Sequence, residues 1–179
     1  MLGNKHDGYY CEIGANHPFE SSNTFLLEKD FSWKGFSIEI DSKLVDIFNS
    51  KRLNLCVCHD ATTYNYLEKF KISEFPRQID YLSIDIEPAE NTYKALRKLP
   101  LHEYRFSVIT YEHDCHVSGP KFMTLSREYL ESMGYKLVIA NVRSFGRDFE
   151  DWWIDPIIIP EIIWGKYESR NIEFSEIFK

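Results

Sequence analysis

The sequence has no long uninterrupted apolar run and no apolar segment at its start. Its longest apolar stretch, residues 152–159, is broken by Asp155 and Pro156, and the opening residues MLGNKHDGYY lack the hydrophobic region of a secretion signal. The sequence therefore predicts no membrane span, and a cytoplasmic protein is expected. Cysteine is also scarce: the four cysteines lie in or beside apolar runs, which favours reduced thiols over disulfides.

Basic residues are too few to balance the acidic ones. The chain has 21 Lys and Arg residues and 28 Asp and Glu residues, which gives a net charge of −7. Such a field repels phosphate backbones, so no nucleic-acid partner is expected and a neutral or cationic ligand is favoured. Cys56 and Cys58 are spaced more closely than the usual ligands of a structural zinc site, and no metal is assigned to them.

Short β-rich runs that alternate with helical segments make up most of the chain. Its 179 residues suit one domain, 1–179, with a core of about 8–156 and a C-terminal arm of about 157–179. The pattern predicts an α/β fold whose mostly parallel, seven-stranded sheet carries helices on both faces. The expected strands are 9–13, 35–40, 53–58, 81–86, 106–111, 136–141 and 151–159. The expected helices are 22–30, 42–50, 89–99 and 121–133.

Acidic residues stand at or just after the ends of five expected strands. They are Glu12, Glu39, Asp41, Asp60, Asp85, Glu87, Glu112 and Asp114. Parallel α/β sheets bind ligands beyond the carboxyl ends of their strands, so this series predicts a binding site at that edge. Capping of the next helix is the alternative explanation; it suits Asp41 and Asp60 but not the glutamates, because Glu is a poor N-cap residue.

The first strand runs into Glu12-Ile13-Gly14-Ala15-Asn16, which carries one glycine where a dinucleotide-binding loop needs three. NAD and FAD are therefore disfavoured. S-adenosylmethionine has no phosphate, and acids suit its sulfonium, its ammonium group and its ribose diol. Glu39 follows Gly14 at about the distance at which a βαβ unit delivers an acid to a ribose.

Four segments in order, YCEIGAN, SSNTFLLE, WKGFSIE and IDYLSIDIEPAE, resemble the successive signatures of the FkbM-like methyltransferases, and Asp151-Trp152-Trp153 resembles a later segment. The resemblance covers about residues 8–156. It implies a Rossmann-like class I methyltransferase fold, S-adenosylmethionine as donor, and O-methylation of a sugar, lipid or polyketide hydroxyl. Two departures stand out: the family more often has Asp where Glu12 stands and Gly where Pro88 stands.

The resemblance also assigns roles to residues. It implies that Glu12, Gly14 and Asn16 line the methionine end of the cofactor, that Glu39 binds the ribose, and that Asp60 and Ala61 form the adenine rim. The full expected cofactor-binding set is Glu12, Gly14, Ala15, Asn16, Asn23, Glu39, Asp60, Ala61 and Asp85.

O-methylation needs a base within reach of the acceptor hydroxyl. Asp85, Glu87 and His113 are the candidate catalytic residues, because they follow the strands that flank the expected position of the donor methyl group. His113 is open to a second explanation, a buried structural histidine. A divalent metal held by the same three residues is a further alternative, without support of its own.

The acceptor is expected to be a small molecule or a glycan. The apolar segment 152–164 leaves room for a homodimer. A non-catalytic binding module of the same fold is the main alternative, although such a module has no need of both Gly14 and Glu39. An NAD-dependent oxidoreductase is disfavoured by the missing glycines.

Overall fold

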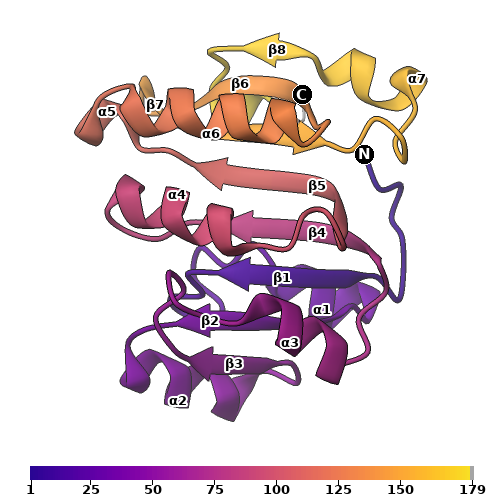
Figure 1. Ribbon diagram of the computed structural model, residues 1–179, viewed down its shortest axis with the longest axis vertical. Coiled ribbons are helices and arrows are strands. Elements are labelled where there is room, and N and C mark those ends of the chain that lie inside the picture. The colour runs from indigo at the N-terminus through magenta and orange to yellow at the C-terminus, as the bar shows by residue number, and fades with distance from the viewer. Residues whose placement is uncertain (178–179) are drawn as a thin grey trace.

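The computed structural model describes residues 1–177 and shows one mixed sheet with the strand order β3-β2-β1-β4-β5-β7-β6-β8 (Figure 1). Strands β1 to β5 run parallel, β7 lies antiparallel between β5 and β6, and β8 pairs parallel with β6. The strands are β1 Tyr9–Ile13, β2 Lys34–Glu39, β3 Leu55–Cys58, β4 Gln78–Ile84, β5 Arg105–Glu112, β6 Lys136–Ser144, β7 Arg147–Ile154 and β8 Ser169–Arg170.

Helices cover both faces of this sheet. They are α1 Phe25–Phe31, α2 Ser42–Lys51, α3 Tyr66–Ile72, α4 Ala89–Lys98, α5 Cys115–Ser118, α6 Lys121–Ser132 and α7 Glu161–Trp164, with 3-10 turns at Gly165–Tyr167 and Phe174–Glu176. Right-handed crossovers place α1 and α2 on one face and α3, α4 and α6 on the other. In Figure 1, α4 and α6 lie in front of the sheet and α1 lies behind it.

The core follows the alternation of strand side chains. In β1, Cys11 and Ile13 join the main cluster with residues of α3, α4 and α6, whereas Glu12 is buried towards α1. In β7, Trp153 is fully buried in the main cluster, and Trp152 packs with the cluster on the opposite face.

The predicted α/β fold is confirmed, with two differences in the sheet. It has eight strands rather than seven, because β8 adds an edge, and β7 makes it mixed. Both of the last two expected strands differ in their bounds, since β6 continues to Ser144 and β7 runs from Arg147 to Ile154. Helix α3 was not predicted, although Asn65 caps it by accepting from the backbone N–H of Glu68.

Residues beyond the core pack onto the sheet face opposite the main cluster. Ile159, Ile163, Trp164 and Tyr167 join the apolar cluster formed there by β5, β6 and β7. Within residues 1–177, no helix is long and apolar enough to cross a membrane.

Candidate functional site

The turn after β1 brings two strand ends into direct contact. Gly14 has a φ of +89°, and its backbone N–H donates to the carbonyl of Ile38 at 2.9 Å. A Cβ atom at Gly14 would lie 1.7 Å from the carbonyl oxygen of Asp85. Only glycine tolerates both the conformation and the contact, so this residue allows the β1 loop to close against the end of β4.

The carboxylate of Glu39 joins the ends of β1 and β2. One oxygen accepts from the backbone N–H of Asn16 at 2.9 Å, and the other accepts from Ile40 and Asp41 at 2.8 and 3.0 Å. A carboxylate offers about four acceptor positions, so roughly one remains for a ligand hydroxyl. Glu39 is half-buried and is therefore held in place at the rim before any ligand arrives.

Glu12 lies beneath this loop rather than on its surface. It is 2% exposed, and its Oε2 accepts from Ser37 Oγ at 2.7 Å and Thr24 Oγ1 at 2.9 Å. Burial raises the pKa of Glu12 to about 7, against the opposing effect of these two bonds and of Arg52. Arg52 also donates to Thr24 at 3.1 Å, so a buried polar network ties α1 to the floor of the site.

The remaining expected cofactor residues surround the same edge. Asn23 Nδ2 donates to Ser83 Oγ on β4 at 2.9 Å, and Asn16 is exposed beside Glu39. Asp60 is exposed; its bonds from the side chain and backbone of Thr62 lower its pKa. Ala61 is buried next to it.

Helix capping accounts for one acid of the series. The side chain of Asp41 accepts from the backbone N–H of Lys43 at the start of α2, so the capping explanation is confirmed there. Asp60, by contrast, bonds Thr62 within a turn and is not the cap of α3.

A pair of acids lies between the ends of β4 and β5. The strand register, with Ile84 opposite Tyr111, brings Asp85 beside Glu112. Burial, with the charges of Asp85 and Asp114, raises the pKa of Glu112 to about 10. Burial also raises the pKa of Asp85, while the bond from Glu112 opposes this shift. Like charges this close disfavour double ionisation, so the two groups share one proton near neutral pH.

The other two candidate catalytic residues differ sharply in exposure. Glu87 is exposed near Asp85. His113 is fully buried; its Nδ1 accepts from the backbone N–H of Cys115 at 3.2 Å, and its Nε2 lies 3.5 Å from Asp151 Oδ1. These contacts favour the structural explanation for His113.

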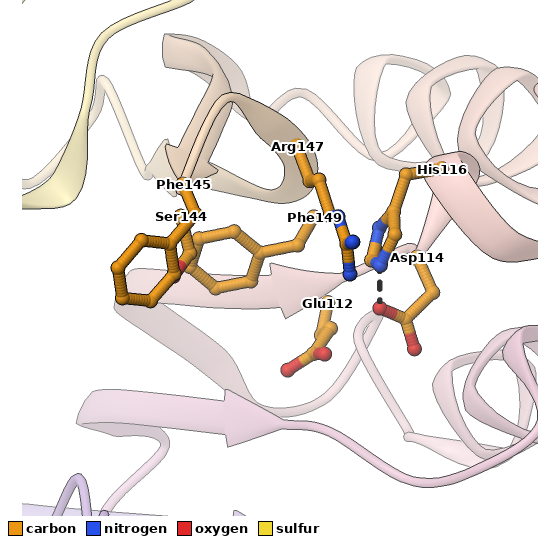
Figure 2. A pocket seen from close by; sticks show the side chains of 7 residues that line it. All are labelled: Glu112, Asp114, His116, Ser144, Phe145, Arg147 and Phe149. Carbon is orange, nitrogen blue, oxygen red and sulfur yellow. Dashed lines mark ion pairs between the residues drawn. The ribbon is translucent and has the colours of Figure 1, made fainter.

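A cavity of about 510 Å³ opens beside Glu112, between the end of β5 and the β6–β7 hairpin. Figure 2 shows Phe145 and Phe149 on one side, Asp114, His116 and Arg147 on the other, and Glu112 between them. The dashed line joins His116 Nδ1 to Asp114 Oδ1, 3.8 Å apart. The hairpin residues were not predicted as part of the site, because the prediction relied on acids at strand ends and none of the hairpin residues that line the cavity is acidic.

Within residues 1–177, no group of three or more His, Cys, Asp and Glu side chains is arranged to hold a metal ion. The side chains of Asp85, Glu87 and His113 do not meet at one point, since Glu87 is exposed and His113 is buried against Asp151.

The sequence matches no family model and no curated protein. Several solved structures share its fold. A proposed rRNA methylase from Clostridium thermocellum is 10% identical, with a TM-score of 0.57 over 84% of this chain and 87% of that one. Aeropyrum pernix fibrillarin with natively bound S-adenosyl-L-methionine is 12% identical, with a TM-score of 0.56 over 86% and 69%.

A third structure, M. capricolum TrmK with the cofactor product S-adenosyl-homocysteine, is 14% identical, with a TM-score of 0.51 over 84% of this chain and 62% of that one. At such low identity the comparisons bear on the fold, and the finer resemblance to FkbM-like enzymes stays a prediction. The chain has the Rossmann-like α/β fold of class I methyltransferases.

Proposed function

We propose that this protein is an S-adenosylmethionine-dependent methyltransferase that modifies a hydroxyl group of a small molecule or glycan. The observation that carries the proposal is the joining of Gly14, Glu39 and Asp85 at one edge of the sheet, through the contact of Gly14 with Asp85 and the bond from Asn16 to Glu39. The bound cofactor of the fibrillarin structure and the cofactor product of the TrmK structure support it.

The residues present suit this cofactor. The Gly14 turn presents backbone without a side chain, Glu39 keeps about one free acceptor position for a ribose hydroxyl, and Asp60 with Ala61 forms the outer rim. Asn23 borders the loop, and Glu12 supports it from below. When bound, S-adenosylmethionine supplies an electrophilic methyl group; the protein has to position the acceptor and remove its proton.

Asp85 is the proposed base. We assign the shared proton to Glu112, which leaves Asp85 as the ionised member of the pair that accepts the proton of the acceptor hydroxyl. Glu112 donates to Asp85 and holds its carboxylate in position. We assign Glu87 to the exposed rim of the acceptor path and His113 to the positioning of Asp151.

The cavity beside Glu112 is the proposed acceptor site. Phe145 and Phe149 offer faces for a sugar ring, and polar groups on the other side offer hydrogen bonds to its hydroxyls. RNA is the competing acceptor, because an rRNA methylase stands among the structural neighbours. The net charge of −7 favours the smaller, uncharged acceptor.

Isothermal titration with S-adenosylmethionine, with NAD as the comparison ligand, tests the cofactor assignment. We expect micromolar binding of S-adenosylmethionine alone, reduced at least tenfold in Glu39→Gln and unchanged in Glu128→Gln, which alters an exposed acid on α6. If folded wild-type protein binds neither ligand, the methyltransferase proposal fails and the non-catalytic binding module replaces it.

A further inference from the structure

A second cavity, of about 690 Å³, lies on the sheet face that carries α1. Strand residues Tyr81, Val108, Thr110 and Trp152 form its floor. Its walls come from α1, from residues 1–5 and from the C-terminal arm; they include Leu26, Leu27, Phe31, Tyr167 and Phe174. Of the described residues that line it, none belongs to the Asp85–Glu112 pair or the Gly14 turn.

The position of this cavity follows from the layers of the fold. Helices α1 and α2 cover this face over β1 to β3, and the C-terminal arm covers it over β6 and β7. Between them, over β4 and β5, the chain supplies the extended residues 1–5. Sheets of parallel strands are normally covered on both faces, so the gap is a missing piece of an otherwise apolar layer.

One end of the cavity is polar but carries little charge. Glu150 is 8% exposed and accepts from Trp152 Nε1, and the Tyr81 and Thr110 hydroxyls lie 2.8 Å apart nearby. Burial raises the pKa of Glu150 to about 8. Its carboxyl group is therefore mostly protonated at neutral pH and offers an O–H donor to a neutral ligand.

The size of the cavity decides between a small molecule and a protein segment. Small-molecule sites enclose about 300–1,000 Å³, a range that includes this one. A docked helix is roughly 10 Å across and needs a broad, open floor. Val108 and Thr110 on the floor are only 9% and 8% exposed, so the floor offers little open surface to a docked helix.

We propose that this cavity is a second binding site, which takes a slender neutral molecule with an apolar chain or flat ring and one hydrogen-bond acceptor directed at Glu150. The site borders the proposed cofactor site at Asn23, shares none of the residues that line the proposed acceptor cavity, and its occupancy requires neither cofactor nor acceptor. Lys5, the cationic side chain on its wall, is already paired with Asp80 at 2.6 Å and does not call for an anionic ligand.

Intrinsic tryptophan fluorescence provides the test, because Trp33 and Trp152 line the cavity. The probe is 1-decanol, with decanoate as the anionic comparison, added to the whole chain at pH 7. We expect saturable 1:1 binding of decanol and at least tenfold weaker binding of decanoate. Leu26→Glu, at a wall residue that is 58% exposed, should weaken decanol binding at least tenfold.

Ile72→Glu is the matched control, since Ile72 is 73% exposed at the end of α3 and away from this cavity. It should leave decanol binding unchanged, and thermal unfolding should show both variants folded. The proposal is overturned if decanol does not saturate the wild type, if Leu26→Glu binds as the wild type does, or if decanoate binds equally well. Because no step uses S-adenosylmethionine, these outcomes are independent of the methyltransferase assignment.

Discussion

At the scale of single residues, Gly14 is the position where geometry leaves least freedom. Gly14→Ala should destabilise the protein by more than about 3 kcal/mol and abolish cofactor binding, because the new Cβ would collide with the Asp85 carbonyl. Gly119 is the matched control: its φ is +73°, yet within residues 1–177 no atom lies within 4 Å of a Cβ built there. Gly119→Ala should cost only the conformational strain of about 1–2 kcal/mol. Urea unfolding measures the free energy of unfolding of both variants. Equal losses of stability would contradict the close contact of Gly14 with the Asp85 carbonyl.

The shared proton of Asp85 and Glu112 leads to a second prediction. Asp85→Asn should lower kcat by about 10²–10⁴, because the acceptor hydroxyl loses its base. Glu112→Gln should keep kcat within about tenfold, since the amide is neutral and still donates a hydrogen bond, as the protonated acid does. Methyl transfer to an acceptor found by screening measures the difference. The opposite order of losses would assign the base to Glu112.

At the scale of elements, Asp151 ties three of them together. Its carboxylate accepts two bonds from Arg127 on α6, at 2.7 and 2.8 Å, and one from the backbone N–H of Asn141 on β6 at 2.9 Å. Although burial opposes it, Arg127 and His113 lower the pKa of Asp151. Asp151→Asn should therefore reduce the free energy of unfolding by about 3–5 kcal/mol.

An exposed ion pair provides the comparison for this variant. Arg77 and Glu103 lie 3.0 Å apart with side chains 63% and 44% exposed, so Arg77→Gln should cost less than about 1 kcal/mol. Chemical denaturation of the two variants checks the contrast. Similar losses would mean that the buried pair contributes no more than a surface pair.

The elements that sequence alone predicted are those with a strong local pattern. Strand β1 was predicted with its observed bounds, Tyr9–Ile13, because a β-rich run ends there at a glycine. Helix α3 was missed because its short apolar pattern lies in a stretch of polar and aromatic residues. The antiparallel placement of β7 depends on pairing between distant segments, which no local pattern specifies.

The sequence predicted at which edge of the sheet the candidate site lies, but not the contacts between its residues. The acids at strand ends located it, and Glu39 does bond the β1 loop. The partnership of Asp85 with Glu112 depends on the register of β4 against β5, and the burial of Glu12 depends on which face of β1 it occupies. Both are properties of the assembled sheet.

At the scale of the whole molecule, buried acids give stability an unusual pH dependence. The pKa of Glu12 is raised to about 7 and that of Glu150 to about 8, so above pH 4.5 the unfolded chain releases protons that the folded one keeps. Stability should therefore fall as the pH rises from about 5 to 8. Glutamine does not titrate, so in Glu12→Gln the free energy of unfolding should fall by about 3 kcal/mol less than in the wild type between pH 4.5 and 7. Chemical denaturation at several pH values measures the free energy of unfolding. If this free energy does not change with pH in the wild type, the raised pKa values of Glu12 and Glu150 are contradicted.

The overall charge makes a prediction about the acceptor. With a net charge of −7, the protein should transfer labelled methyl groups to free, uncharged sugars and leave bulk RNA unlabelled at physiological salt. Salt-dependent labelling of RNA, with no labelling of any sugar, would assign the acceptor to nucleic acid instead.

The insertion of β7 between β5 and β6 also bears on how the protein is made. Strand β5 is complete at Glu112, but β7, which pairs with its other edge, ends at Ile154, about 40 residues later in the chain. At translation rates of roughly 5–20 residues per second, the free edge of β5 waits about 2–8 s on the ribosome before its partner is synthesised. During that interval the nascent chain presents a strand with one unpaired edge and with Phe106, Val108, Ile109 and Tyr111 among its residues, the kind of surface that pairs with other chains.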